Sequence, residues 1–137
     1  MAKAVAVGVS LSPPNEIDAL NIRAASLLAM RRAIASLSIS PARVLIDGNA
    51  LPPDLPCGAD AIVKGDGRSL SIAAASIVAK VTRDRLMRNL DDACPLYGFA
   101  RHAGYPTLAH RKALERNGAT AHHRKSFAPV AAILTRS

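Results

Sequence analysis

Short apolar runs alternate along the chain with longer segments in which apolar residues recur at helical spacing. Three runs have the length of buried strands: Ala4–Val9, Arg43–Ile46 and Ala61–Val63. The predicted helices run from Asn15 to Ser40, from Ser69 or Ser71 to about Asp92, from about Thr107 to Asn117, and from Pro129 onward. This order predicts an open α/β layer fold in which helices cover a small sheet.

Residues at the predicted helix ends support these limits. Asn15 can cap the first helix, and Asp18 then stands at its third position, where the helix dipole favours a negative charge. Either Ser69 or Ser71 can cap the next helix. Gly118 follows the short helix as a stop signal.

Composition limits the class of protein. The 137 residues, half of them hydrophobic, predict a single folded domain with an aliphatic core, because only 3% are aromatic. Cys57 and Cys94 match no metal-binding spacing, and no apolar run reaches the ~18 residues of a membrane span. The N-terminus has no convincing signal peptide. We therefore expect a reduced, cytoplasmic monomer without a membrane partner.

Positive charge is concentrated in the second half of the chain. Residues 1–60 carry five basic and five acidic groups, whereas residues 61–137 carry 13 basic and five acidic groups and so the whole net charge of +8. A basic half favours a polyanionic partner, most simply nucleic acid, although a basic surface kept for solubility is the alternative. The candidate contacts in this half are Lys64, Arg68, Arg124 and Lys125.

Two aspartates follow two of the predicted strands. Asp47 comes directly after the strand that ends at Ile46, and Asp66 lies in the glycine-rich loop after Ala61–Val63. If the strands are neighbours, the two carboxylates converge at one end of the sheet, where they could hold Mg²⁺ or Mn²⁺. The alternative is an Asp-Gly turn at Asp47 and a solvated charge at Asp66.

Tyr105 lies among basic residues and histidines. An aromatic ring beside Arg101 and His102 suits stacking on a sugar or base, and the alternative is a tyrosine packed beneath a loop. The other histidines are His110, His122 and His123. No Cys–His pattern accompanies the four, so we expect solvated or phosphate-contacting histidines rather than a zinc site.

Three further patterns favour no chemistry. The loop at Asp66 lacks the full phosphate-binding GxxxxGK[ST] pattern, which disfavours an NTPase. Neither cysteine has an identifiable basic partner, which disfavours a thiol nucleophile. Arg83-Asp84-Arg85 is interpreted as an exposed charged turn of the long helix with local ion pairing.

Taken together, the motifs resemble the ribonuclease HII family, the bacterial type 2 ribonucleases H. Five strings carry the resemblance in the family's order: EIDALNIRAASLLAMRRAI (16–34), VLIDGN (44–49), AIVKGDGRSLSIAAASIVAKVTRDRLM (61–87), YGFARHAGYPT (97–107) and HHRKSFAPV (122–130). They span nearly the whole chain.

The resemblance implies a fold and an activity. The fold would be α/β and RNase H-like, a mixed sheet flanked by helices. The activity would be metal-dependent endonucleolytic cleavage of the RNA strand of RNA–DNA hybrids and incision at ribonucleotides embedded in duplex DNA. Mg²⁺ or Mn²⁺ would be the cofactor, and the products a 5′-phosphate and a 3′-hydroxyl. Such an enzyme would serve ribonucleotide excision repair and DNA replication.

The resemblance also implies roles for three residues. Asp47, in IDGN, resembles a metal-binding catalytic aspartate, and Asp66, in KGD, resembles the fourth carboxylate of the family's active site. Tyr105, in GYPT, resembles the tyrosine that recognises the ribonucleotide–deoxyribonucleotide junction. His102 and the basic residues named above would help to hold the nucleic acid.

One part of the family's pattern does not occur. The Asp-Glu pair of the DExGRG motif, which the family carries on its first strand, is absent from the sequence. We therefore interpret residues 1–137 as a single, partial, N-terminally truncated catalytic domain that lacks the family's first two strands. The alternatives are a catalytically inactive remnant that only binds nucleic acid and a structural or partner-binding domain.

Overall fold

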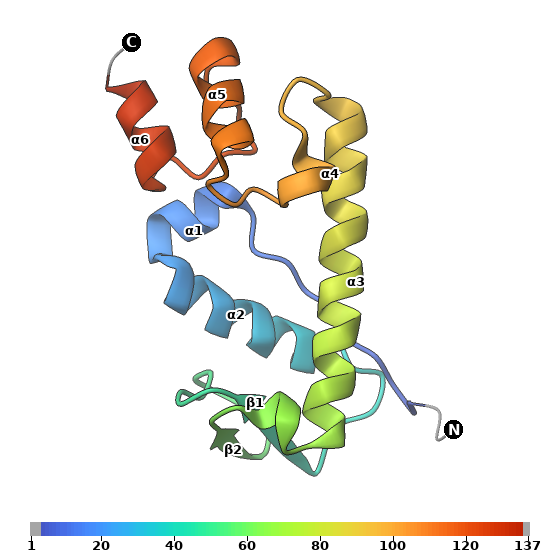
Figure 1. Cartoon of the computed structure of the whole chain (residues 1–137). Helices are drawn as coiled ribbons and strands as arrows, with labels where there is room; N and C mark the ends of the chain where they lie inside the picture. Colours follow the sequence, from blue (N-terminus) through green and yellow to red (C-terminus); the bar gives the residue numbers. More distant parts are fainter. Residues whose placement is uncertain (1–3, 136–137) are drawn as a thin grey trace. The chain divides into compact units, whose positions relative to one another are not determined.

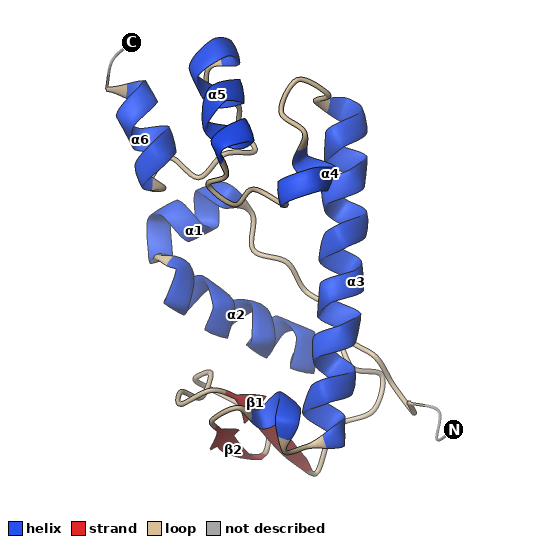
Figure 2. Ribbon diagram, in the orientation of Figure 1, coloured by secondary structure: helices blue, strands red, loops and turns tan. Residues whose placement is uncertain are grey.

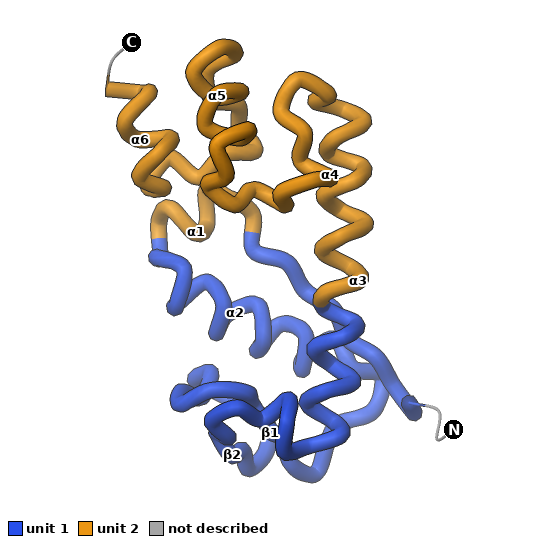
Figure 3. Tube along the Cα trace, in the orientation of Figure 1, with its two compact units in different colours: residues 1–12, 20–79 blue, residues 13–19, 80–137 orange. Residues whose placement is uncertain are grey.

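The computed structural model describes residues 4–135. The elements follow one another as α1, α2, β1, β2, the 3₁₀ helix η1, α3, α4, α5 and α6 (Figures 1 and 2). They form two compact units (Figure 3). Unit 1 combines the chain before Pro13 with Leu20–Ala79, and unit 2 combines Pro13–Ala19 with the chain from Lys80 onward. The predicted α/β class is confirmed.

The sheet of unit 1 consists, within the described residues, of two parallel strands. β1 (Arg43–Asp47) pairs with β2 (Gly58–Ile62) in a register that runs from Arg43 opposite Gly58 to Asp47 opposite Ile62. Side chains alternate along β1, so that Val44 and Ile46 are buried on one face. The strand predicted at Ala61–Val63 is therefore present as β2. It begins three residues before Ala61 and ends before Val63.

The predicted strand Ala4–Val9 is wrong. This segment forms no strand, and Val5 and Val7 are largely exposed. Its backbone lies against α2 (Ile22–Ala35) instead, because a Cβ added to Gly8 would clash with the carbonyl oxygen of Ala33. Within the described residues no neighbouring strand offers a ladder to this apolar segment, so its β-propensity has nothing to pair with.

The predicted helix from Asn15 to Ser40 is two helices. α1 (Pro14–Leu20) ends before Asn21, whose φ of 73° no helix accommodates. Asparagine tolerates this conformation, and its side chain then accepts a hydrogen bond of 3.0 Å from the amide of Ala24, which caps α2. Asn21 is therefore the capping residue, and the predicted cap at Asn15 is wrong.

The later helices follow the sequence more closely. η1 (Gly65–Gly67) leads into α3 (Leu70–Ala93), close to the predicted limits. α5 (Leu108–Asn117) begins after Thr107, whose hydroxyl accepts from the amide of His110 at 3.2 Å, and α6 (Ala128–Leu134) is the predicted short tail helix. α4 (Phe99–His102) is a single turn that the sequence analysis missed.

Unit 2 has a core of its own. Four buried residues form it: Tyr97, Phe99, Leu114 and Val130. The rings of Tyr97 and Phe99 stack at a centroid distance of 5.4 Å. The hydroxyl of Tyr97 donates toward the carbonyl oxygens of Asn117 and Gly118, which ties the end of α5 to this core.

Candidate active site and nucleic-acid interface

The parallel pairing of β1 with β2 brings the carboxyl ends of both strands to one edge of the sheet. Asp47 is the last residue of β1 and lies opposite Ile62, the last residue of β2. The amide of Gly48 donates to the carbonyl of Ile62 at 3.0 Å, so the pairing continues for one residue past the strand. The neighbouring strands that the sequence analysis required are therefore present.

The loop that carries Asp66 is attached to Asp47. The amide of Gly65 donates a 2.8 Å hydrogen bond to the Asp47 carboxylate, Oδ1. Gly65 is buried, and a Cβ there would come within 2.5 Å of the Ile72 side chain and 3.4 Å of Asp47 Oδ1. Only a residue without a side chain lets the loop approach Asp47 this closely. Asp66 is thereby fixed one residue beyond a direct contact with Asp47.

Both carboxylates keep an oxygen available. Asp66 Oδ1 accepts from the amide of Gly67 at 3.0 Å, and Asp47 Oδ1 accepts from Gly65. Among the hydrogen bonds of residues 4–135, none occupies Oδ2 of either aspartate. Both residues are exposed, as are Lys64 and Arg68 on either side of η1. This edge of unit 1 thus presents the carboxylate of Asp47, at the end of β1, and that of Asp66, in a loop with two basic side chains.

A small cavity of about 260 Å³ opens beside Asp47. Arg23 and Ser26 of α2 line it together with Asp47 and Asn49. The sequence analysis gave Arg23 and Asn49 no role. The signal for Arg23 was present, since it lies off the apolar stripe of its helix, but only the fold shows that this face of α2 meets the end of β1.

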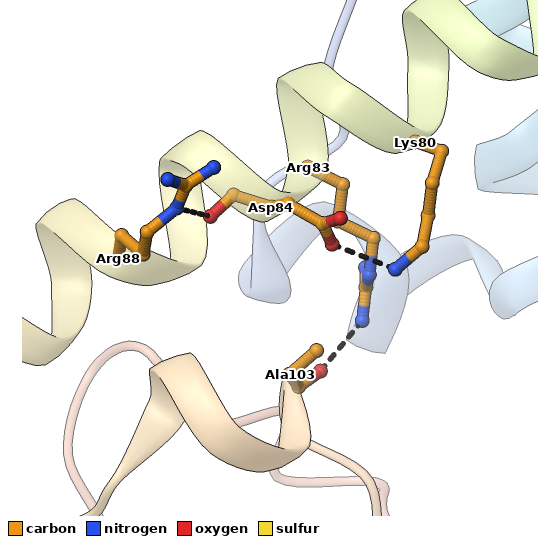
Figure 4. A network of polar contacts seen from close by, with 5 residues as sticks. All are labelled: Lys80, Arg83, Asp84, Arg88 and Ala103. Carbon is orange, nitrogen blue, oxygen red and sulfur yellow. Dashed lines mark hydrogen bonds and ion pairs between the residues drawn. The ribbon is translucent and has the colours of Figure 1, made fainter.

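Tyr105 belongs to unit 2 and lies on its surface with 65% of the residue exposed. The alternative of a tyrosine packed beneath a loop is therefore wrong. The guanidinium of Arg83 lies 5.9 Å from the ring centroid, and its Nη2 donates to the carbonyl of Ala103 at 2.7 Å (Figure 4). Ala103 and Gly104 both have positive φ, of 48° and 80°. Arg83 thus holds the tight turn that presents Tyr105.

His102 is buried in unit 2 with both ring nitrogens engaged. Nε2 lies 2.8 Å from the carbonyl oxygen of Tyr97, and the amide of Gly104 donates to Nδ1 at 3.2 Å. Because a carbonyl only accepts, Nε2 donates to Tyr97, and Nδ1 accepts from Gly104. The nucleic-acid contact predicted for His102 has no ring nitrogen left to make it, and the ring supports the Tyr105 turn instead.

His110 and His123 are also buried in unit 2, and their rings form a hydrogen-bonded pair. His110 Nδ1 must donate to the carbonyl of Tyr105 at 3.0 Å, so its Nε2 accepts, at 3.3 Å, from Nε2 of His123. The amide of Thr120 donates to the other nitrogen of His123 at 3.1 Å. Burial lowers the pKa of His110, and burial with the neighbouring His110 lowers the pKa of His123 to about 4. The expectation of solvated or phosphate-contacting histidines is wrong for these rings, because they form a neutral network inside the unit.

The basic loop after α5 is held by a residue from the start of the chain. The Asp18 carboxylate accepts from the amides of Lys125 and Ser126 at 2.7 and 2.9 Å, and from the Ser126 hydroxyl. These hydrogen bonds, from Ser126 above all, lower the pKa of Asp18. Arg124 lies over the ring of Phe127 at 5.0 Å, while Lys125 is exposed. The two basic side chains predicted to contact nucleic acid are thus carried by an anchored loop.

The predicted site residues fall in both units. Asp47, Asp66, Lys64 and Arg68 lie in unit 1, and Tyr105, His102, Arg124 and Lys125 lie in unit 2. Among known proteins, the family model of ribonuclease HII matches residues 1–130. The chain belongs to the ribonuclease HII family.

Several ribonuclease HII relatives match nearly all of the chain. The ribonuclease HII of Marinomonas sp. (strain MWYL1) is 54% identical over 132 residues, which are 96% of this chain and 66% of that protein. The ribonuclease HII of Paracidovorax citrulli (strain AAC00-1) is 56% identical over 137 residues, 99% of this chain and 56% of that protein. The chain therefore spans between about half and two thirds of the length of the curated relatives it matches.

A solved structure confirms the fold. The crystal structure of the ribonuclease H2 from Pyrococcus horikoshii OT3 superposes with a TM-score of 0.71 at 24% sequence identity, covering 90% of this chain and 66% of that one. The RNase H-like fold expected from the resemblance is thus confirmed. No helix in the described part of the chain has the length and apolarity to cross a bilayer.

Proposed function

We propose that the chain is an endoribonuclease that cleaves the RNA strand of RNA–DNA hybrids and incises duplex DNA at embedded ribonucleotides. The products are a 5′-phosphate and a 3′-hydroxyl. The observation that carries the proposal is the hydrogen bond from Gly65 to Asp47, which fixes Asp47 and the Asp66 loop at one edge of the sheet in a chain of this family.

The cofactor we propose is Mg²⁺ or Mn²⁺. Asp47 and Asp66 supply hard oxygen donors, and each retains one oxygen outside the hydrogen bonds described above. Within residues 4–135 no group of three or more His, Cys, Asp or Glu side chains is placed to hold a metal. Mg²⁺ is commonly bound by one or two carboxylates together with substrate phosphates, so the two aspartates fit such a shared site. The ion would activate water and stabilise the charge on the phosphoryl group.

The residues around this edge have the chemistry to orient a nucleic acid. Lys64 and Arg68 place positive charge on both sides of Asp66, where a phosphate backbone would be attracted. In unit 2, the exposed ring of Tyr105 offers a face for a sugar or base, and Arg124 and Lys125 add basic contacts. The 2′-hydroxyl is the group that distinguishes a ribonucleotide at the cleaved position. We further propose that the protein acts as a cytoplasmic monomer in ribonucleotide excision repair and DNA replication.

The decisive experiment uses a labelled DNA duplex with one ribonucleotide, incubated with the chain and Mn²⁺ or Mg²⁺. We expect a single incision at the ribonucleotide, lost at least a hundredfold in Asp47→Asn and Asp66→Asn, since each removes a charged ligand. Asp92→Asn is the matched control, because Asp92 is an exposed aspartate at the other end of α3. Incision that is unchanged in Asp47→Asn would contradict the catalytic role of this site.

The second candidate function is nucleic-acid binding without cleavage. It is favoured by the basic half of the chain and by the absence of the DExGRG pair from the sequence, which leaves two of the four carboxylates of the family's site. The same duplex distinguishes the two functions. Salt-sensitive binding without any incision, in either metal, supports the binding function and rules out the enzyme in this chain.

A further inference from the structure

A groove of about 580 Å³ lies on unit 2 between the C-terminal half of α3 and the turn around α4. Its lining includes three basic residues and a tyrosine: Lys80, Arg88, Arg101 and Tyr105. None of the three basic residues has a role in the function proposed above. We propose that this groove, which we call the α3–α4 groove, binds backbone phosphates of the nucleic-acid strand on which Tyr105 stacks. The inference rests on the proposed function and extends it to a second contact surface.

The spacing of α3 places its charges in the groove. Lys80, Asp84 and Arg88 are separated by four residues each and therefore share one face of the helix. Lys80 Nζ pairs with the Asp84 carboxylate at 2.7 Å, so the acidic group in the groove is already neutralised (Figure 4). Arg88 uses only its Nε, in a 3.3 Å hydrogen bond to the main-chain oxygen of Asp84. Its terminal nitrogens stay available to an anion.

The opposite wall adds a second cation. Arg101, in α4, is exposed and lines the groove. Among residues 4–135 no carboxylate pairs with Arg88 or Arg101, since the ion pairs there involve other arginines and lysines. His102 lines the groove, but both its ring nitrogens are occupied as described above. The groove therefore carries two uncompensated guanidinium groups, which suit phosphate oxygens by their fork geometry.

Tyr105 defines which anion fits. Its exposed ring lies at the same groove, and Thr107 beside it supplies a hydroxyl. An aromatic face next to two guanidinium groups matches a nucleotide strand, in which a base or sugar alternates with phosphate. A free phosphate or a small anion would use the arginines without the ring.

The test measures binding of an all-DNA duplex and of the same duplex with one ribonucleotide, by fluorescence anisotropy over a series of salt concentrations. In the double variant Arg88→Gln/Arg101→Gln we expect weaker binding of both duplexes. The slope of log K against log salt should become shallower by about 2, because each lost phosphate contact removes roughly 0.9. Arg88→Lys/Arg101→Lys keeps the charge and should retain most of the slope.

The matched control is Lys112→Gln/Arg116→Gln. Lys112 and Arg116 are exposed on α5 and lie outside the lining of the groove. Their substitution removes the same total charge as the groove variant. Thermal melts followed by circular dichroism verify that each variant folds. Equal slopes for the groove variant and the wild type, or an equal change in the control, would overturn the inference.

The outcomes separate this inference from the proposed function. Loss of slope in the groove variant, without ribonucleotide-dependent incision by the wild type, supports the groove and contradicts the enzyme. Incision that is retained with an unchanged slope supports the enzyme and overturns the groove. A wild type that binds neither duplex contradicts both.

Discussion

Arg83 shows how one side chain can position another. It donates to the carbonyl of Ala103 and lies over the ring of Tyr105, while the neighbouring Arg85 is exposed and takes no part in these contacts. The sequence predicted an exposed charged turn with local pairing here. That is confirmed for Asp84, which pairs with Lys80 one helical turn away. The contact of Arg83 with a loop 20 residues later has no local pattern and could not be predicted.

The role of Arg83 can be tested through Tyr105. Arg83→Met removes a charged hydrogen bond and a cation–π contact, together worth about 1–2 kcal/mol at an exposed site. We expect affinity for the ribonucleotide-containing duplex to fall on the order of tenfold, measured by anisotropy. Arg85→Met is the control and should leave the affinity unchanged.

A double-mutant cycle separates positioning from direct binding. If Arg83 acts by holding Tyr105, Arg83→Met should cost little in a Tyr105→Ala background. Fully additive losses would show instead that Arg83 contacts the nucleic acid by itself.

At the scale of elements, regular periodicity predicted well and special residues did not. The apolar spacing located α3, in which Ile72 is buried and Met87 and Leu90 pack against the core of unit 2, and α5, in which Leu114 is buried. The break at Asn21 was missed, since the helical spacing continues through it and only its positive φ reveals the end of α1. The strand predicted at Ala4–Val9 failed for the opposite reason, because β-propensity says nothing about whether a partner strand is available.

The buried histidines of unit 2 also emerge only from the packing of several elements. His110 comes from α5 and His123 from the following loop, and their neutral forms are required by hydrogen bonds to Tyr105 and Thr120. A proton on His110 Nε2 or on His123 Nδ1 would place two donors against each other. The sequence shows the four histidines but not that three of them converge.

This network predicts stability that depends on pH. The pKa of His123 is lowered from 6.5 to about 4, so the folded state holds fewer protons than the unfolded state between these values. Its contribution is therefore complete above pH 6.5 and is lost as the pH falls toward 4. We expect the free energy of unfolding, from urea titrations at several pH values, to fall by about 3 kcal/mol over this window.

His123→Gln should flatten the pH dependence in that window, since glutamine does not ionise. The control is His122→Gln, because His122 is the exposed neighbour of His123. An equal effect of both substitutions would show that the acid sensitivity arises elsewhere in the chain.

At the scale of the whole chain, the sequence predicted the family and its motif residues better than it predicted the contacts between distant segments. The sequence strings around Asp47, Asp66 and Tyr105 indicated the ribonuclease HII family, and the comparisons confirm this family. The pairing of the two strands could be proposed because an aspartate follows each apolar run, Asp47 directly and Asp66 in the next loop. Contacts between distant segments could not, because a single hydrogen-bonded side chain leaves no periodic signal along the sequence.

Asp18 is an example of a contact between segments far apart in the sequence, and it gives the last prediction. The sequence predicted that Asp18 stabilises the start of a helix through the helix dipole. Its carboxylate instead accepts hydrogen bonds from the amides of Lys125 and Ser126, 107 and 108 residues later. Asp18→Ala removes the carboxylate that accepts these hydrogen bonds. We expect trypsin to cleave after Arg124 and Lys125 several times faster in the variant, because a loop without its anchor opens more often. Glu115→Ala, an exposed acidic residue of α5, is the control, and equal cleavage rates in the wild type and Asp18→Ala would contradict the anchoring role.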